Sequence, residues 1–354
     1  MATFLEYSRE GLKLNEIKEW KKEVFSFFIA WHNQSETISV NTSGSTGQAK
    51  TIVIAKKHMI VSARATLRYL HVEPHELAWL CMPARYIAGK MVIVRAIVGD
   101  LDLVITKPQS TPQVPSAGTI GIAAMVPVQV YNLLHASKLN KTIIEQTIQN
   151  LIIGGSFIHQ NLENELAAFK MTKVWHTYGM TETLSHIALR QINAEPTETH
   201  FTPLPGVTLS NDSNNCLVID YPKLGLDRLH TNDIVVIEPD GKFYVKGRID
   251  YVLNIKGIKI NPEEIEKKIE TVLPYSCCVT SRPDEVSGES LILCIEGEPQ
   301  LVTSICSIWD SIVRVLQKHE IPAEITFFQP FSRNENGKLD RVDIKNKILT
   351  FTTS

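Results

Sequence analysis

Residues 41–51 read NTSGSTGQAKT, and this stretch decides how the rest of the chain is understood. Two glycines, several hydroxyl residues and a lysine within so few positions are typical of a loop that holds phosphate through backbone amides and hydroxyls. From Gly44 onward the stretch approaches the triphosphatase loop G-x-x-x-x-G-K-[ST], but Ala49 stands where that loop needs its second glycine. The sequence therefore predicts a phosphate loop of another kind.

The residues after Lys50 indicate what kind of loop this is. In a triphosphatase loop a helix begins at the lysine, whereas residues 51–54 (TIVI) are mostly β-branched and favour a strand. Residues 37–41 (TISVN) also predict a strand. We expect Lys50 to lie in a hairpin-like loop between two strands, although a triphosphatase switch and an ordinary turn remain as alternatives.

Composition limits the class of protein. The chain has 354 residues, 44% hydrophobic and 21% charged, with a formal net charge of -2. These values predict a globular protein of two domains and argue against a nucleic-acid binder. No apolar run is long enough to cross a membrane and the N-terminus does not resemble a secretory signal. The six cysteines have no C-x-x-C spacing, which indicates reduced, mostly buried thiols and a cytoplasmic location.

The spacing of apolar residues along the chain predicts its helices and strands. Apolar residues at helical spacing predict helices over 15–31 and 57–70. Apolar strands alternate with helical stretches through 78–155, which is typical of a layered α/β domain. Residues 105–118 are rich in proline and serine and predict a surface loop. Shorter strands separated by turns follow from about residue 205.

The C-terminal part has a different character. Asn261 and Pro262 form a helix start, with asparagine as the N-cap and proline at the first helical position. The residues that follow suffice for a small α+β domain. We therefore expect a large α/β domain at residues 1–249 and a small C-terminal domain at residues 250–354.

Five motifs in order along the chain resemble those of the adenylate-forming superfamily, which contains acyl-CoA synthetases and adenylation domains. The resemblance implies a layered α/β domain, here with a trimmed N-terminal region, joined by a hinge to a mobile C-terminal domain. The motifs are TSGSTGQAK at 42–50, YGMTET at 178–183, TNDIVVIEPDG at 231–241, GRID at 247–250 followed by Gly257 and PEEIE at 262–266, and NGKLDR at 336–341.

The resemblance also implies a two-step reaction. A carboxylate attacks the α-phosphate of ATP to give an acyl-adenylate and pyrophosphate, and a thiol then displaces AMP. ATP, Mg²⁺ and coenzyme A are the implied cofactors and small molecules the implied partners. No nucleic acid and no membrane insertion are expected, and formation of a homo-oligomer is left open.

By resemblance, the nucleotide is held by residues from several motifs. Glycines after an apolar strand allow close approach of the backbone to adenine, Tyr178 stacks on the base, Asp233 accepts from the ribose hydroxyls, and Glu182 carries Mg²⁺. The full predicted set for ATP and AMP is Thr42, Ser43, Gly44, Ser45, Thr46, Gly47, Lys50, Gly154, Gly155, Ser156, His176, Thr177, Tyr178, Gly179, Thr181, Asp233 and Arg248.

The predicted catalytic residues are Lys338, Thr181 and Arg248. Lys338 would bridge the substrate carboxylate and the α-phosphate as a compact cation. Asp250 stands where the family places its hinge, and Lys256 and Gly257 belong to the loop that the resemblance brings toward the thiol after domain rotation.

The acid is predicted from Arg95, which interrupts an apolar helix. An arginine in such a place is costly unless it is paired. Its partner could be an internal carboxylate or a carboxylate on the substrate. Its spacing resembles that of short bacterial o-succinylbenzoate–CoA ligases of menaquinone biosynthesis, whose substrate has two carboxylates.

Other residues are expected beside Arg95 in the substrate site, and His186 could add a polar contact. They are Arg85, Tyr86, Gly179, Thr183 and Ser185. The main alternative is a ligase that loads another aryl or acyl acid onto coenzyme A or a carrier protein, and a non-catalytic nucleotide-binding module is a second.

Overall fold

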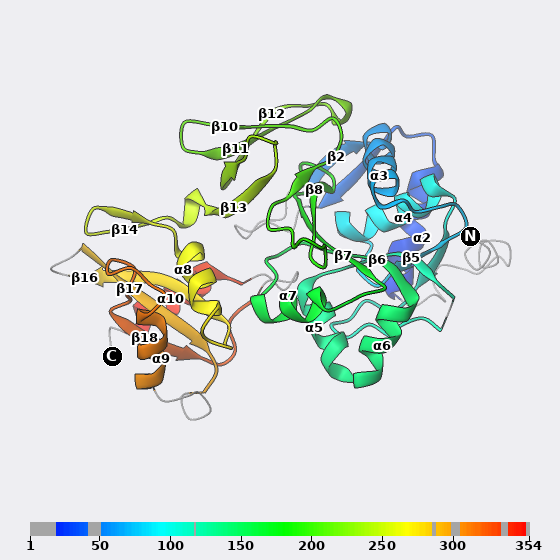
Figure 1. Ribbon diagram of the computed structural model, residues 1–354. Coiled ribbons are helices and arrows are strands. Elements are labelled where there is room, and N and C mark those ends of the chain that lie inside the picture. Colours follow the sequence, from blue (N-terminus) through cyan, green and yellow to red (C-terminus); the bar gives the residue numbers. More distant parts are fainter. Residues whose placement is uncertain are drawn as a thin grey trace. The chain divides into compact units, whose positions relative to one another are not determined.

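The computed structural model describes residues 19–41, 51–116, 118–284, 288–298, 305–333 and 339–351 (Figure 1). The chain divides into two compact units. Unit 1 comprises residues 1–158, 165–208 and 220–228, and unit 2 comprises residues 159–164, 209–219 and 229–354. The domain boundary expected between residues 249 and 250 remains a prediction, and the two units are described separately below.

A seven-stranded sheet forms the centre of unit 1, in the order β4-β3-β5-β6-β7-β8-β9. The first five are parallel and the last two antiparallel. Apolar runs such as IGIAAM, buried at every position of β5, explain why these segments form inner strands. The bounds are β3 Leu77–Leu80, β4 Asp102–Ile105, β5 Ile120–Met125, β6 Ile148–Ile153, β7 Lys173–Gly179, β8 His186–Gln191 and β9 Thr202–Pro203.

Helices connect and cover these strands. Helix α4 packs on β3 and α3, α2 packs on α4, and α6 packs on α5 and β6. The alternation of strand and helix confirms the predicted layered α/β architecture. The bounds are α2 Glu19–His32, α3 Lys56–Leu70, α4 Ile87–Gly99, α5 Pro127–Ala136, α6 Lys138–Thr147 and α7 Gln160–Ala167.

A two-stranded hairpin precedes α3, formed by β1 (Thr37–Asn41) and β2 (Thr51–Ala55). The strands are antiparallel and pair from Thr37 with Ala55 to Asn41 with Thr51. The two predicted strands are therefore confirmed. The described residues after position 50 form strand β2 and not the helix that a triphosphatase loop requires there, which contradicts the triphosphatase alternative.

Shorter strands follow the central sheet, as predicted from residue 205 onward. They form a four-stranded sheet in the order β10-β11-β12-β13. The bounds are β10 Thr208–Asn211, β11 Cys216–Tyr221, β12 Leu226–Ile237 and β13 Phe243–Arg248, with the 3₁₀ helices η2 Pro222–Leu224 and η3 Ile249–Tyr251.

The C-terminal part of unit 2 is an α+β arrangement around the sheet β16-β17-β18. Asn261 caps α8 as predicted, since its side chain accepts from the Glu263 backbone N–H at 3.0 Å. Ile265 and Ile269 of α8 are buried in a core cluster shared with β17 and α9. The bounds are β14 Leu253–Ile255, β15 Ile258–Ile260, α8 Pro262–Glu270, β16 Cys277–Asp284, β17 Gly288–Glu296, α9 Ile305–Val313, β18 Glu324–Phe328 and α10 Arg341–Phe351.

The cysteines are as expected. All six are free thiols and five of them are buried, with Cys306 exposed. None of the helices in the described ranges is long and apolar enough to cross a membrane.

Candidate active site

The predicted adenine-binding glycines, Gly154 and Gly155, directly follow the carboxyl end of β6, beside the adjacent parallel strand β7. A Cβ atom at Gly154 would lie 2.3 Å from Thr177 Oγ1, and Gly155 has a φ of 86°, which favours glycine. The Thr177 hydroxyl donates to the Ile153 carbonyl oxygen at 3.3 Å. Open α/β sheets bind ligands beyond the carboxyl ends of their strands, so this edge is a suitable nucleotide site.

The other face of β7 carries an aromatic cluster. His176 and Tyr178 both pack against Phe201, with ring centroids 5.0 and 6.0 Å apart. Arg190 pairs with His176 across the β7–β8 ladder, and its Nη2 lies 3.1 Å from His176 Nδ1. The end of β7 is thereby fixed from both faces. Arg190 and Phe201 could not be predicted from the sequence, because only the strand pairing brings them to this place.

The turn after β7 is held by Thr183, which is fully buried. Its Oγ1 accepts from the Met180 backbone N–H at 2.9 Å and donates to the Ser185 carbonyl oxygen at 2.7 Å. A Cβ at Gly179 would lie 2.4 Å from the same carbonyl oxygen. In the structure, then, these two predicted substrate residues shape the turn that presents its neighbours.

Glu182, in the same turn, has an exposed side chain. Within the described ranges its carboxylate forms no hydrogen bond or ion pair, and no group of three histidine, cysteine, aspartate or glutamate residues could hold a metal there. A single free carboxylate fits Mg²⁺ that arrives with nucleotide phosphates, because this ion uses one or two carboxylates plus phosphate oxygens. Glu182 would be the protein ligand of such an ion.

Arg95 lies in α4 and is 3% exposed. Its Nη2 donates to Ser185 Oγ at 2.5 Å, while its Nε is buried and has no hydrogen-bond partner among the described residues. Ser185 Oγ lies 3.4 Å from His186 Nδ1, and His186 Nε2 lies 3.0 Å from Thr66 Oγ1 on α3. Arg95, Ser185 and His186, all named from the sequence, are therefore brought together.

The charge of Arg95 has no counter-ion among the residues that the structure describes. No ion pair in the described part of the chain includes it, and burial lowers the pKa of its guanidinium to about 10. Burial, followed by the positive charge of Arg95, lowers the pKa of His186 well below the ordinary value, so His186 is neutral at pH 7. Two partners were considered for Arg95, an internal carboxylate and a carboxylate on the substrate. In the described ranges, no carboxylate forms an ion pair with Arg95.

Arg85 and Tyr86 precede α4. The Arg85 guanidinium lies 3.4 Å from Glu23 Oε1, and its carbon Cζ lies 5.0 Å from the centroid of the Tyr86 ring. Tyr86 is the N-cap residue of α4. Arg85 therefore differs from Arg95 in having a carboxylate partner within the protein.

A second group of predicted residues lies in unit 2, where Asp233 on β12 faces Arg248 on β13. Arg248 Nη1 lies 3.2 Å from Asp233 Oδ1, and Arg248 Nε and Nη2 donate to the two oxygens of Asp250 at 3.1 and 2.8 Å. Burial opposes the charge of Arg248, but hydrogen bonding to Asp250 and the charges of both carboxylates hold its pKa above the ordinary value. Asp233 is therefore oriented by Arg248, which keeps its positive charge.

Lys256 and Gly257 form the tight turn between β14 and β15. Their φ values are 53° and 82°, and this pair of left-handed residues is typical of a two-residue hairpin turn. The predicted phosphate-loop residues 42–50 and the predicted catalytic Lys338 lie outside the described residues. The described residues on either side of 334–338 are joined by a β-bridge between Arg333 and Leu339.

Comparison with known proteins defines the class. A family model described as AMP-binding enzyme matches residues 35–221, and the chain belongs to this family of adenylate-forming ligases. A solved acyl-CoA synthetase (AMP-forming)/AMP-acid ligase II-like protein from Dyadobacter fermentans is 26% identical with a TM-score of 0.62, and the match covers 95% of this chain and 97% of that one.

Other relatives match this chain at lower sequence identity. A 2-succinylbenzoate–CoA ligase of Lactococcus lactis is 24% identical over 87% of this chain and 70% of its own length. A D-alanine–D-alanyl carrier protein ligase of the same organism is 21% identical over 92% and 73%. The o-succinylbenzoate CoA synthetase of Bacillus subtilis, solved with its acyl-adenylate, is 18% identical, covers 87% of this chain and 68% of its own, and shares the fold with a TM-score of 0.71.

Proposed function

We propose that this protein is an AMP-forming acid–thiol ligase for o-succinylbenzoate that acts in menaquinone biosynthesis. It would form the acyl-adenylate with release of pyrophosphate, and then o-succinylbenzoyl-CoA and AMP. The observation that carries the proposal is the buried guanidinium of Arg95, which has an unpartnered Nε and no carboxylate among the described residues. The benzoate carboxylate of this substrate supplies the missing negative charge while the succinyl carboxylate reacts.

The first step brings two anions together, so positioned cations and donors are the main requirement. Lys338 would contact the reacting carboxylate and the α-phosphate, and Lys50 with the loop around it the β- and γ-phosphates. Thr181 would donate to the α-phosphate, and Mg²⁺ on Glu182 would neutralise phosphate charge. Arg248 would support the ribose or phosphate.

The adenine and the ribose would each be held by residues described above. Gly154, Gly155 and Ser156 would lie against adenine with Tyr178 on the other side of the base, and Asp233 would accept from the ribose hydroxyls. Support for this assignment comes from the close approach that Gly154 permits and from the fixed orientation of Asp233 by Arg248.

D-Alanine is the competing substrate suggested by the carrier protein ligases, which match at similar identity. Its activation would place an ammonium group in the acid site. A buried guanidinium without a counter-ion repels an ammonium and attracts a carboxylate. Arg95 therefore favours a dicarboxylic acid over an amino acid.

The test is to incubate the protein with ATP and Mg²⁺ and with o-succinylbenzoate, D-alanine or a panel of aryl monocarboxylates, with and without coenzyme A. Pyrophosphate release and mass spectrometry of the products report both steps. We expect pyrophosphate and an acyl-adenylate with o-succinylbenzoate, converted by coenzyme A into the thioester and AMP. Turnover of D-alanine or a monocarboxylate but not of o-succinylbenzoate would refute the substrate assignment and leave the family intact.

A further inference from the structure

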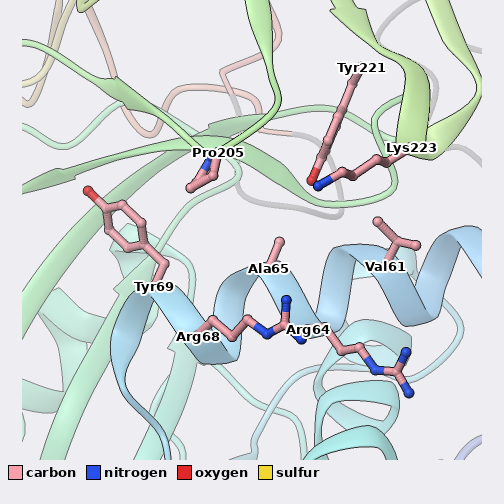
Figure 2. Close-up of a pocket in the computed structure, with 8 residues that line it drawn as sticks. All are labelled: Val61, Arg64, Ala65, Arg68, Tyr69, Pro205, Tyr221 and Lys223. Carbon is pink, nitrogen blue, oxygen red and sulfur yellow. The ribbon is translucent and has the colours of Figure 1, made fainter.

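Unit 1 contains a pocket of about 360 Å³ that the residues assigned above do not use. Figure 2 shows helix α3 on one side of it, and Pro205 with the end of β11 and η2 on the other. The lining residues are Val61, Arg64, Ala65, Arg68, Tyr69, Pro205, Tyr221 and Lys223.

The pocket is strongly basic. Arg64 and Arg68 lie one turn apart on α3, Lys223 comes from the opposite side, and no lining residue is acidic (Figure 2). Across the described ranges, none of these three side chains forms an ion pair with a carboxylate. The charge of Glu198 acts on the lining residue Tyr69, and Glu198 Oε2 accepts the Gln191 backbone N–H at 2.9 Å.

This arrangement is unfavourable for the helix itself. Like charges four residues apart on one helix repel each other. The helix dipole stabilises Arg68 in the last turn, but it explains neither Arg64 in the middle of the helix nor Lys223 outside it. A bound anion would compensate all three charges.

The remaining lining suits an organic anion. Val61, Ala65 and Pro205 provide apolar surface. The hydroxyls of Tyr69 and Tyr221 are neutral at pH 7, since burial raises pKa values that are already high, and the Tyr69 hydroxyl also hydrogen-bonds to Thr202. A Cβ at Gly206 would lie 3.6 Å from the Tyr221 ring and 3.8 Å from Lys223 Nζ. An aromatic face and a cation therefore lie close together, which is an arrangement that holds an aromatic ring bearing phosphate groups.

Helix α3 joins this pocket to the acid site. Thr66, which follows the pocket residue Ala65, lies 3.0 Å from His186 Nε2, and His186 lies beside Ser185 and Arg95. The pocket and the Arg95 group therefore contact the same helix, the pocket through the exposed Arg64 and Arg68 and the Arg95 group through the buried Thr66.

We propose that this pocket binds the phosphate groups of an organic phosphate, and that the ligand is the nucleotide end of the thiol substrate coenzyme A. This inference rests on the proposed function. The phosphates would pair with Arg64, Arg68 and Lys223, since arginine binds phosphate in a bidentate geometry. A carrier-protein thiol lacks this nucleotide, so the pocket would select coenzyme A over a carrier protein.

Binding is measured by calorimetry with adenosine 3′,5′-bisphosphate, which is part of the nucleotide end of coenzyme A, and separately with inorganic pyrophosphate. The variant is Arg68→Ala combined with Lys223→Ala, both at exposed positions. The matched control is Lys57→Ala, an exposed cation of the same helix outside the pocket lining. We expect the affinity for adenosine 3′,5′-bisphosphate to fall at least about tenfold in the double variant and to stay unchanged in the control.

Kinetics provide the second readout. With the activated acid, KM for coenzyme A should rise at least about tenfold in the double variant. KM for pantetheine, which lacks the nucleotide, and the rate of pyrophosphate release should not change. Equal binding of the bisphosphate to all three proteins would overturn the proposal. Loss of pyrophosphate binding alone would assign the pocket to free phosphate and overturn the coenzyme A assignment. The binding assay remains informative if o-succinylbenzoate is not a substrate, so the two proposals fail separately.

Discussion

Replacing Arg95 should stabilise the protein and impair it as a ligase at the same time. Burial lowers the pKa of Arg95 from 12.5 to about 10. At about 1.4 kcal/mol for each pKa unit, the charged guanidinium then costs the folded state about 3 kcal/mol. Arg95→Met removes this cost and fills a similar volume, so we expect the melting temperature of unit 1 to rise by a few degrees.

The same substitution removes the proposed contact with the second carboxylate of the substrate. Loss of one partner of a buried charge pair costs about 2–4 kcal/mol, which corresponds to a fall of about 30- to 700-fold in kcat/KM for o-succinylbenzoate. Arg95→Lys keeps the charge but loses the planar guanidinium that binds a carboxylate in a bidentate geometry. Its kcat/KM should therefore lie between those of the wild type and Arg95→Met. For a monocarboxylate turned over by the protein, kcat/KM should change little.

The assays are pyrophosphate release for kcat/KM and thermal unfolding for stability, with Arg314→Met, an exposed arginine of unit 2, as control. A fall in melting temperature for Arg95→Met would mean that an internal carboxylate neutralises the arginine. An equal loss of activity toward dicarboxylates and monocarboxylates would also refute the reasoning, because it would make Arg95 a structural residue.

Three further predictions concern other residues. Lys338→Ala should abolish pyrophosphate release while ATP still binds, as measured by calorimetry; retained turnover would remove Lys338 from the first step. Arg341 Nη1 donates to Glu266 Oε1 at 2.7 Å in a mostly buried pair, so Arg341→Met should destabilise unit 2 by about 3–5 kcal/mol in urea unfolding, and adding Glu266→Gln should recover part of this loss. If the double variant is no more stable than the single one, the unpaired carboxylate is not the cause. Burial, followed by the charge of Glu266, raises the pKa of Glu270 from 4.5 to about 7. The folded state therefore binds this proton more tightly than the unfolded state, and the free energy of unfolding falls as the pH rises from about 4.5 to 7. Glu270→Gln should therefore be more stable than the wild type by about 3 kcal/mol at pH 8 and nearly equal to it at pH 4, whereas a difference independent of pH would contradict this.

The sequence by itself determined the architecture where local preference and burial agree. Residues 51–54 form a strand because β-branched side chains favour it, and together with Ala49 this strand distinguishes the motif at 42–50 from that of a triphosphatase. The helix start at Asn261 was predictable because capping depends on neighbouring residues only. The order of the motifs determined the family, which the match over residues 35–221 confirms.

Only the tertiary structure decided what each side chain contacts. Arg85 and Arg95 are similar in the sequence, but the fold pairs Arg85 with the carboxylate of Glu23, whereas Arg95 donates to the hydroxyl of Ser185. The sequence also did not predict that Thr183 holds its turn, or that α3 and Lys223 line a basic pocket. The physical reason is that hydrogen bonds and charge pairs depend on distances between segments far apart in the chain, and local propensity contains no information about those distances.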